Sequence, residues 1–291
     1  MIEIENCEIL ENASLKNFCT FKIGGNAKYV FVSHTISALL KSCDYCIENS
    51  IKFKVIGFGA NILFDDAGFN GAIIVNRASK IISRNNSLYI HSGAPISAVI
   101  NKCFMRELSG IENLSGIPAS VGGAVFNNLG SGETTFSEFV EWVEGYDIPT
   151  LKKRRISNHN CNFGYRTSLF KSINFLITKV KLSLPYGNKA HIRVNIINAI
   201  DKKIKNQPLD KPSAGSVFKR GNIIPAKIID ELGLKGTRIR DACISTKHAG
   251  FIVNTYSATS QDVKQLISLI QNKVKETHGE TLEPEIEFVD F

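Results

Sequence analysis

Three side chains from distant parts of the sequence could act on an acidic substrate. Arg166 precedes a predicted strand, and its guanidinium could hold a carboxylate through two parallel hydrogen bonds. Ser216 lies in a turn of small residues that could present its hydroxyl close to the charge of Lys219. Glu285 belongs to a predicted strand, 282–288, in which glutamates alternate and so share one face. Taken singly, these residues are more typical of a surface arginine, a capping serine and a solvated strand.

A glycine-rich stretch, 109–132, is the segment around which the rest of the chain is organised. Because glycine tolerates positive φ and has no Cβ, backbone N–H groups in such a stretch can approach a ligand closely. Pro118 and Ser120 indicate a turn that leads into a short helix, with Ser120 as its N-cap or as a phosphate contact. Successive amides before a helix would form an anion site. A tight loop packed between sheets explains this stretch alone equally well.

Two further glycine turns precede the middle of the chain, at Gly24-Gly25 and at 57–61 (GFGAN). A dinucleotide fold of the Rossmann type would need glycine at position 62, where the chain has Ile62. Three glycine turns nevertheless suggest one long ligand that crosses several loops. A flavin dinucleotide has this length and two phosphates.

The composition of the 291 residues is that of an ordinary globular protein, with 43% apolar residues. An acidic start and the lack of a long apolar run favour a cytoplasmic location without membrane segments. The seven cysteines are scattered, and Cys43 and Cys46 lie in a predicted helix without nearby histidines, so we expect no disulfide framework and no metal. A net charge of +8 favours anionic partners, but the basic run 152–155 has no interleaved aromatic residues and is expected to be a solvated loop.

Helical and extended patterns alternate along the chain, which indicates an α/β or α+β fold. Apolar periodicity predicts helices at 36–48, 96–105, 192–204, 225–233 and 259–279, and strands at 54–56, 72–75, 88–91, 140–146 and 176–184. Thr259 can cap the last helix together with Asp262, and Gly279 closes it. A turn at 185–188 breaks the pattern, and we place the main domain boundary there.

Taken together and in order, these motifs resemble the UDP-N-acetylenolpyruvoylglucosamine reductase family of bacterial cell-wall synthesis. The similarity covers nearly the whole chain, through FKIGGNA at 21–27, GFGANIL at 57–63, GIPASVGGAVFNN at 116–128, CNFGYRTSLFK at 161–171, PSAGSVFK at 212–219, LGLKGTRIRDACISTKHAGFIVN at 232–254 and LEPEIEF at 282–288. Any one motif would be weak evidence, whereas seven in sequence are specific.

The resemblance implies an α+β fold with two domains. Residues 1–187 would form an FAD-binding domain of the p-cresol-methylhydroxylase (vanillyl-alcohol-oxidase) type, with lobes of about 1–78 and 79–187. Residues 188–291 would form a smaller α+β substrate-binding domain. The short separation of about 50 residues between Arg166 and Ser216 resembles the shorter subclass, which lacks an inserted substrate-covering loop.

The implied reaction is the reduction of UDP-N-acetylglucosamine enolpyruvate to UDP-N-acetylmuramate by an oxidoreductase that binds FAD non-covalently. NADPH would reduce the flavin, and hydride would then pass from flavin N5 to the methylene carbon of the enolpyruvyl ether. The resemblance makes Ser216 the proton donor, and makes Arg166 and Glu285 the residues that stabilise the enolate. A serine hydroxyl is a poor acid in water, so this role calls for a dry site with a cation near, for which Lys219 is the candidate.

Cofactor and substrate contacts are implied in the same way. The cofactor residues are Gly24, Gly25, Gly57, Phe58, Gly59, Ala60, Asn61, Ile62, Gly93, Gly116, Ile117, Pro118, Ala119, Ser120, Gly122, Gly123, Ala124 and Asn127. The substrate residues are Tyr165, Arg166, Lys219 and Lys227, with Lys235 as a further candidate for the diphosphate. No metal, nucleic acid or membrane partner is implied, and we expect a monomer.

The sequence departs from the family's commonest pattern at three single positions and in the run 128–132, where NLGSG replaces a more regular alanine- and glycine-rich run. Ala60 stands where serine is usual, which removes a possible phosphate hydrogen bond worth about 1–3 kcal/mol. Ala119 replaces a glycine, and Glu287 replaces a frequent arginine. These changes concern substrate and cofactor contacts rather than Arg166, Ser216 and Glu285.

Two other functions are compatible with parts of the pattern. One is an FAD oxidase of the same fold acting on a sugar or alcohol, although no histidine lies in 57–63 to tether a flavin covalently. The other is a basic nucleotide- or RNA-binding protein without catalysis, which would not need Arg166, Ser216 and Glu285 as a set.

Overall fold

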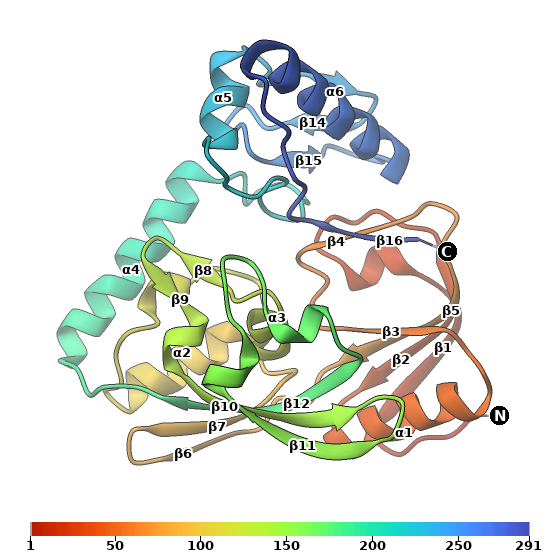
Figure 1. The fold of residues 1–291 in the computed structure, drawn as a ribbon, viewed down its shortest axis with the longest axis vertical. Coiled ribbons are helices and arrows are strands. Elements are labelled where there is room, and N and C mark those ends of the chain that lie inside the picture. The colour runs from red at the N-terminus through yellow and green to blue at the C-terminus, as the bar shows by residue number, and fades with distance from the viewer. Residues whose placement is uncertain (1, 291) are drawn as a thin grey trace. The chain divides into compact units, whose positions relative to one another are not determined.

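A computed structural model describes residues 2–290 of the chain (Figure 1). The residues cluster into two compact units, each drawn from several parts of the sequence. The first unit contains the residues up to Ile9, Val30–Gly57 and Ile73–Lys202. The second contains Leu10–Tyr29, Phe58–Ala72 and the residues from Lys203 onward. The domain boundary expected after residue 187 is not tested by this grouping and stays a prediction.

The first unit is built on a five-stranded antiparallel sheet, and helices α2 (Ile96–Met105) and α3 (Val121–Phe126) pack against one face of it (Figure 1). Its strand order is β11 (Lys152–Ser157), β10 (Val140–Asp147), β12 (Phe175–Ser183), β7 (Ser87–His91) and β6 (Ile81–Arg84). Along β12, Thr178, Val180 and Leu182 are buried, as their alternation predicts. This packing forms the core that supports the glycine-rich stretch.

The basic run 152–155 is part of edge strand β11, so the expectation of a loop is wrong. The strand pairs with β10, where the buried carboxylate of Glu144 accepts a hydrogen bond from Arg155 at 2.9 Å and lies 3.0 Å from Lys153 Nζ. Burial acts to raise the pKa of Glu144, but these two partners and the nearby charge of Lys179 outweigh it and lower the pKa. Lys153 and Arg155 therefore form ion pairs with the neighbouring strand. The sequence does not predict this strand, because its four consecutive basic residues show no alternation of apolar and polar side chains.

A second sheet has the order β1 (Cys7–Ser14), β2 (Asn26–Ser33), β5 (Phe69–Asn76) and β3 (Phe53–Ile56). Helix α1 (Ile36–Glu48) follows β2, and Thr35 caps its N-terminus by accepting from the Ala38 amide at 3.1 Å. Cys43 and Cys46 are buried on this helix, and burial raises the pKa of the Cys46 thiol to about 12. Both cysteines therefore pack as small apolar side chains.

The second unit contains the antiparallel strands β13 (Arg238–Ile239), β14 (Ala242–Ile244) and β15 (Ile252–Asn254), and helices α5 (Pro225–Glu231) and α6 (Ser260–His278). Strand β16 (Glu287–Val289) runs parallel to β4 (Ile62–Phe64), so the end of the chain pairs with a segment more than two hundred residues earlier. The predicted strand 282–288 is therefore only partly correct, because regular pairing begins at Glu287.

The remaining elements are short, apart from helix α4 (Lys189–Asn206), which confirms the helix predicted at 192–204. They comprise strands β8 (Gly130–Ser131) and β9 (Thr134–Thr135) and the 3-10 helices Leu15–Phe18, Glu112–Leu114, Phe136–Phe139, Asn158–Cys161 and Leu169–Lys171. Within residues 2–290, no helix combines the length and apolar character that crossing a membrane requires.

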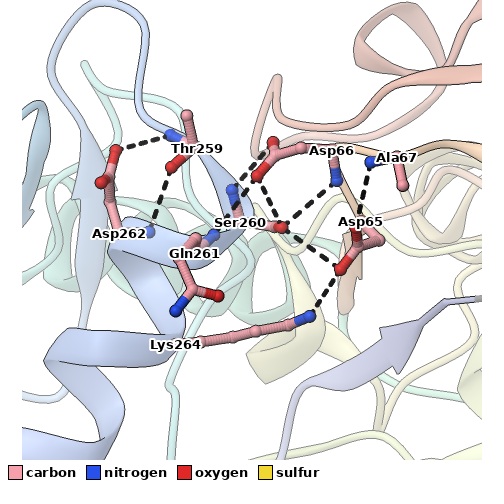
Figure 2. Close-up of polar contacts among 8 residues, drawn as sticks. All are labelled: Asp65, Asp66, Ala67, Thr259, Ser260, Gln261, Asp262 and Lys264. Carbon is pink, nitrogen blue, oxygen red and sulfur yellow. Dashed lines mark hydrogen bonds and ion pairs between the residues drawn. The ribbon is translucent and has the colours of Figure 1, made fainter.

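The N-terminus of α6 is held by side chains from two separate parts of the second unit (Figure 2). Thr259 and Asp262 form the predicted capping box, in which the Asp262 amide donates to Thr259 Oγ1 at 3.1 Å. The carboxylate of Asp66 accepts from the Ser260 amide at 3.0 Å and from the Gln261 amide at 3.3 Å (Figure 2). The first three N–H groups of the helix are thus satisfied, and a negative charge lies at its positive end.

We expect Asp66→Ala to lower the free energy of unfolding by about 1–2 kcal/mol, because it leaves two amides of the first turn of α6 without their acceptor. Urea denaturation of the flavin-loaded protein measures the change. Glu276→Gln, an exposed change near the other end of α6, is the control and should alter stability by less than about 0.5 kcal/mol. Equal stability of Asp66→Ala and wild type would show that Asp66 does not act as a cap.

Candidate active site

Two of the predicted cofactor loops pack directly against each other in the first unit. A Cβ on Gly57 would lie 2.1 Å from Ser120 Oγ, so only glycine lets these loops approach. Ser120 caps α3 by accepting from the Gly123 amide at 3.2 Å, as the sequence predicts. The turn at Gly57 and the glycine-rich stretch therefore lie next to each other in the first unit.

The loop at Gly93 joins the same group. A Cβ on Gly93 would meet Asn76 Oδ1 at 2.6 Å, and the side-chain Nδ2 of Asn76 donates to Ser92 Oγ at 2.8 Å. Ser92 in turn accepts from the Gly122 amide through its carbonyl at 2.7 Å. Three loops that are well separated in sequence are thus locked around the start of α3.

The amides at the start of α3, where the sequence suggests an anion site, donate to acceptors within the protein. Val121 N donates to Ala94 O at 2.9 Å, Gly122 N to Ser92 O, and Gly123 N to Ser120 Oγ. These N–H groups therefore already have acceptors in the protein, and their contact with a phosphate stays a prediction. Gly122 also lets the loop at Ser92 approach, because a Cβ there would lie 3.2 Å from the Ser92 carbonyl oxygen.

Two polar side chains that the sequence analysis missed fit an anionic dinucleotide in this region. Arg77 is half-buried and donates to the Gly57 carbonyl at 2.7 Å, which places a cation beside the loop, and burial lowers its pKa. Ser115 is 3% exposed, and its hydroxyl has no hydrogen-bond partner among the residues that the structure describes. A buried hydroxyl without a partner is costly, and a polar ligand would satisfy it. The sequence contains a weak signal for both residues, because Ser115 precedes Gly116 and Arg77 directly follows a strand.

These observations fit FAD. The loops pack closely because their glycines have no Cβ. The Arg77 guanidinium lies beside them and could bind the diphosphate of a flavin dinucleotide, and the buried Ser115 hydroxyl next to Gly116 could bind a phosphate or ribose hydroxyl. Gly116 has φ +80°, a conformation that favours glycine. Of the other predicted contacts in this stretch, Ala124 is fully buried in the core and Asn127 ends α3. Ile117, Pro118 and Ala119 lie in the irregular segment between the turn at Ser115–Gly116 and Ser120.

The glycines predicted as cofactor contacts in the second unit have packing roles of their own. A Cβ on Gly25 would lie 2.2 Å from Asp66 O, and one on Gly24 2.7 Å from Phe64 Cβ. Gly59 has φ +62°, and a Cβ on this residue would lie 2.3 Å from Phe18 O. Phe58 and Ala60 lie on either side of Gly59, and Ile62 is buried at the start of β4. Their contacts with a cofactor stay predictions.

Arg166 lies in the first unit and is held by its surroundings. Its Nη2 donates to the Gly130 carbonyl at 3.0 Å, and its own carbonyl accepts from Lys171 Nζ at 2.8 Å. The residue has φ +54°, an uncommon conformation for a side chain of this size and one that clusters at functional sites. Tyr165 is exposed, and its ring centre lies 5.4 Å from the Arg166 guanidinium carbon. The guanidinium is therefore positioned rather than a freely rotating surface group.

Ser216 and Glu285 are brought together in the second unit. The Glu285 amide donates to Val217 O at 2.7 Å, and Val217 follows Ser216 directly. Val217 also donates to Gly250 O at 2.9 Å, and Ser216 forms a β-bridge with Phe251. The backbone segments that carry Ser216 and Glu285 thus lie side by side, although they are about 70 residues apart in the sequence. The catalytic roles of the two side chains stay predictions.

The lysines predicted to hold the substrate pair with acidic side chains. Lys219 Nζ forms an ion pair with Glu283 Oε1. Its role as the cation that assists Ser216 stays a prediction. Lys227 lies 3.7 Å from Glu231, and Lys235 lies 2.6 Å from Asp230. These exposed pairs are weak, so they leave the substrate roles as predictions.

Comparison with known proteins decides the family. The chain is 37% identical to UDP-N-acetylenolpyruvoylglucosamine reductase of Caldicellulosiruptor saccharolyticus, over 99% of this chain and 94% of the relative. It is also 37% identical to the enzyme of that name from Pseudothermotoga lettingae, over 98% and 99%. The chain belongs to the UDP-N-acetylenolpyruvoylglucosamine reductase family.

Domain and structure comparisons agree with this membership. Residues 207–289 match the C-terminal domain of UDP-N-acetylenolpyruvoylglucosamine reductase, and residues 27–151 match an FAD binding domain. The crystal structure of UDP-N-acetylenolpyruvylglucosamine reductase (MurB) from Thermus caldophilus is 30% identical, with a TM-score of 0.81 over 98% of this chain and 99% of that one. The α+β fold class and the family resemblance read from the sequence are confirmed.

Proposed function

We propose that this protein catalyses the FAD-dependent reduction of UDP-N-acetylglucosamine enolpyruvate to UDP-N-acetylmuramate, with NADPH as reductant. The observation that carries the proposal is 37% identity to reductases of this name over almost the whole chain. The roles of Arg166, Ser216 and Glu285 come from the family resemblance of the motifs in which they lie. The named relatives favour this reaction over the oxidase of a sugar or alcohol. The lack of interleaved aromatic residues in the basic run makes a nucleic-acid partner less favoured.

The residues of the chain would divide the work as follows. FAD, when bound, supplies the hydride that adds to the methylene carbon of the enolpyruvyl group. Arg166 binds the substrate carboxylate through its fixed donors, which strengthens as negative charge grows there. Ser216 delivers the proton to the carbon that bears the carboxylate and regains one from solvent. Glu285 stabilises the same enolate, which its carboxyl can do as a hydrogen-bond donor in the protonated form.

The other parts of the proposal rest on the family resemblance. Residues 1–187, with lobes of about 1–78 and 79–187, bind FAD non-covalently, and residues 188–291 bind the substrate. Tyr165, Lys219 and Lys227 contact the nucleotide. The protein works as a monomer in the cytoplasm.

Incubation of the purified protein with NADPH and UDP-N-acetylglucosamine enolpyruvate tests the function. We expect a yellow protein, oxidation of one NADPH for each nucleotide consumed, and a product heavier by two hydrogen atoms. A colourless protein that cannot be loaded with FAD, or a flavoprotein that leaves the enolpyruvyl group unchanged, would contradict the proposal.

A further inference from the structure

The segment that carries Glu285 changes its backbone partner at this residue. On one side, Lys219 N donates to Glu283 O at 2.9 Å and Glu285 N donates to Val217 O at 2.7 Å. From Glu287 onward the segment pairs instead with β4, and Glu287 N donates to Asn61 O at 2.9 Å. Glu285 therefore lies at the point where the chain leaves one neighbour and joins the next.

Asn61 binds the segment on both sides of this change. Its side-chain Nδ2 lies 3.0 Å from Glu285 O, while its backbone carbonyl accepts from Glu287. A carbonyl oxygen can only accept, so the amide nitrogen of Asn61 must face it. The intervening Ile286 is 4% exposed, which anchors the bend in the core. One asparagine thus holds both peptide groups that flank Ile286.

Through Glu285 the contact extends to the segment of Ser216. The peptide N–H of Glu285 reaches Val217 O, and its carbonyl reaches Asn61 Nδ2, so this residue is held from two directions. Loss of the Asn61 donor would remove the hydrogen bond to the Glu285 carbonyl and let the Glu285 carboxyl move relative to Ser216. A displacement of about 1 Å in a catalytic group can cost about 10²-fold in rate.

We propose that Asn61 is a positioning residue that sets the place of the Glu285 carboxyl beside Ser216. The inference rests on the proposed function and deepens it. It differs from the sequence-based expectation for Asn61, which is contact with the cofactor. The two roles predict different behaviour, because a cofactor contact acts on flavin binding, whereas a positioning residue acts on the step that uses Glu285.

Asn61→Asp tests this role, since it keeps the shape of the side chain and replaces the donor with a carboxylate that repels the Glu285 carbonyl. We expect flavin affinity and the rate of flavin bleaching by NADPH to stay within about threefold of wild type. Reoxidation of the flavin by the enolpyruvyl nucleotide should slow about 10–10²-fold. Asn70→Asp, an exposed change in the same part of the chain, is the charge control and should change neither half-reaction.

Two further measurements separate positioning from other effects. Hydrogen exchange in the apoprotein should be faster at the Glu287 amide in Asn61→Asp, a readout that needs neither flavin nor substrate. In the Glu285→Gln variant, adding Asn61→Asp should slow flavin reoxidation by less than about threefold relative to Glu285→Gln alone. The effects of two residues that act as a unit are not additive. If Asn61→Asp fails to fold, Asn61→Ala serves for the same measurements.

Several outcomes would overturn the inference. Weaker flavin binding together with equal slowing of both half-reactions would make Asn61 a cofactor contact. The positioning role would be wrong if Asn61→Asp left the rate of flavin reoxidation or the hydrogen exchange of the Glu287 amide unchanged. It would also be wrong if the rate effects of the Asn61 and Glu285 substitutions multiplied in the double variant. Failure of wild type to reduce the nucleotide would instead refute the proposed function, so the two failures are distinguishable.

Discussion

Ser216→Ala protein is expected to be bleached by NADPH at the wild-type rate but to reoxidise with the enolpyruvyl nucleotide about 10²–10⁴-fold more slowly. The change removes only a hydroxyl from a partly exposed turn, and alanine accepts the same backbone conformation. The β-bridge of residue 216 with Phe251 involves backbone atoms and should persist. The loss therefore falls on proton delivery to the substrate carbon, and not on folding or flavin binding.

Stopped-flow absorbance of the flavin, with each half-reaction followed separately, measures this effect. Ser213→Ala, in the same turn, is the matched control, because its carbonyl and not its hydroxyl accepts the hydrogen bond from Thr20 at 2.6 Å. We expect it to behave as wild type. Ser216→Ala protein that reoxidises normally would show that the proton comes from another group.

Arg166→Lys is expected to lower kcat/KM for the enolpyruvyl nucleotide by about 10²–10³-fold. Lysine keeps the charge but lacks the planar pair of donors, and one ammonium cannot bond both the Gly130 carbonyl and a carboxylate in the arginine's geometry. Flavin reduction by NADPH should be unaffected. The left-handed backbone of Arg166 stays equally strained with lysine, so the comparison isolates the side chain.

Steady-state kinetics with the nucleotide as varied substrate measures this loss. Arg154→Lys provides the control, since Arg154 pairs with Asp147 at 3.1 Å on an exposed strand. It should leave both kcat and KM within about twofold of wild type, as expected of an exposed pair. A similarly small change for Arg166→Lys would place the substrate carboxylate elsewhere.

The longer helices of this protein can be predicted from the sequence because their apolar residues recur at helical spacing, and α1 and α6 also begin at a side-chain cap. Helices α1 and α2 have the predicted bounds, and α6 begins at the Thr259 capping box and ends at Gly279 as expected. The strands were harder. Strand β1 has mixed burial without clear alternation, and β11 is a charged edge strand whose partner Glu144 is a neighbour only in the folded sheet.

The candidate site was found by motif type, but its internal contacts could not be predicted. The Ser120 N-cap is a local feature and was foreseen. The approach of Gly57 to Ser120, the Asp66 cap on α6 and the Asn61 contact with Glu285 join residues between 63 and 224 positions apart. No local pattern encodes such pairs, because they depend on how sheets and loops pack.

Anaerobic titration of the flavin-loaded protein tests the central claim most directly. NADPH should bleach the flavin absorbance, which should stay low until UDP-N-acetylglucosamine enolpyruvate is added. One equivalent of the nucleotide should then restore the oxidised spectrum and yield UDP-N-acetylmuramate. A bleached flavin that the nucleotide leaves unchanged, and that only oxygen restores, would contradict the account.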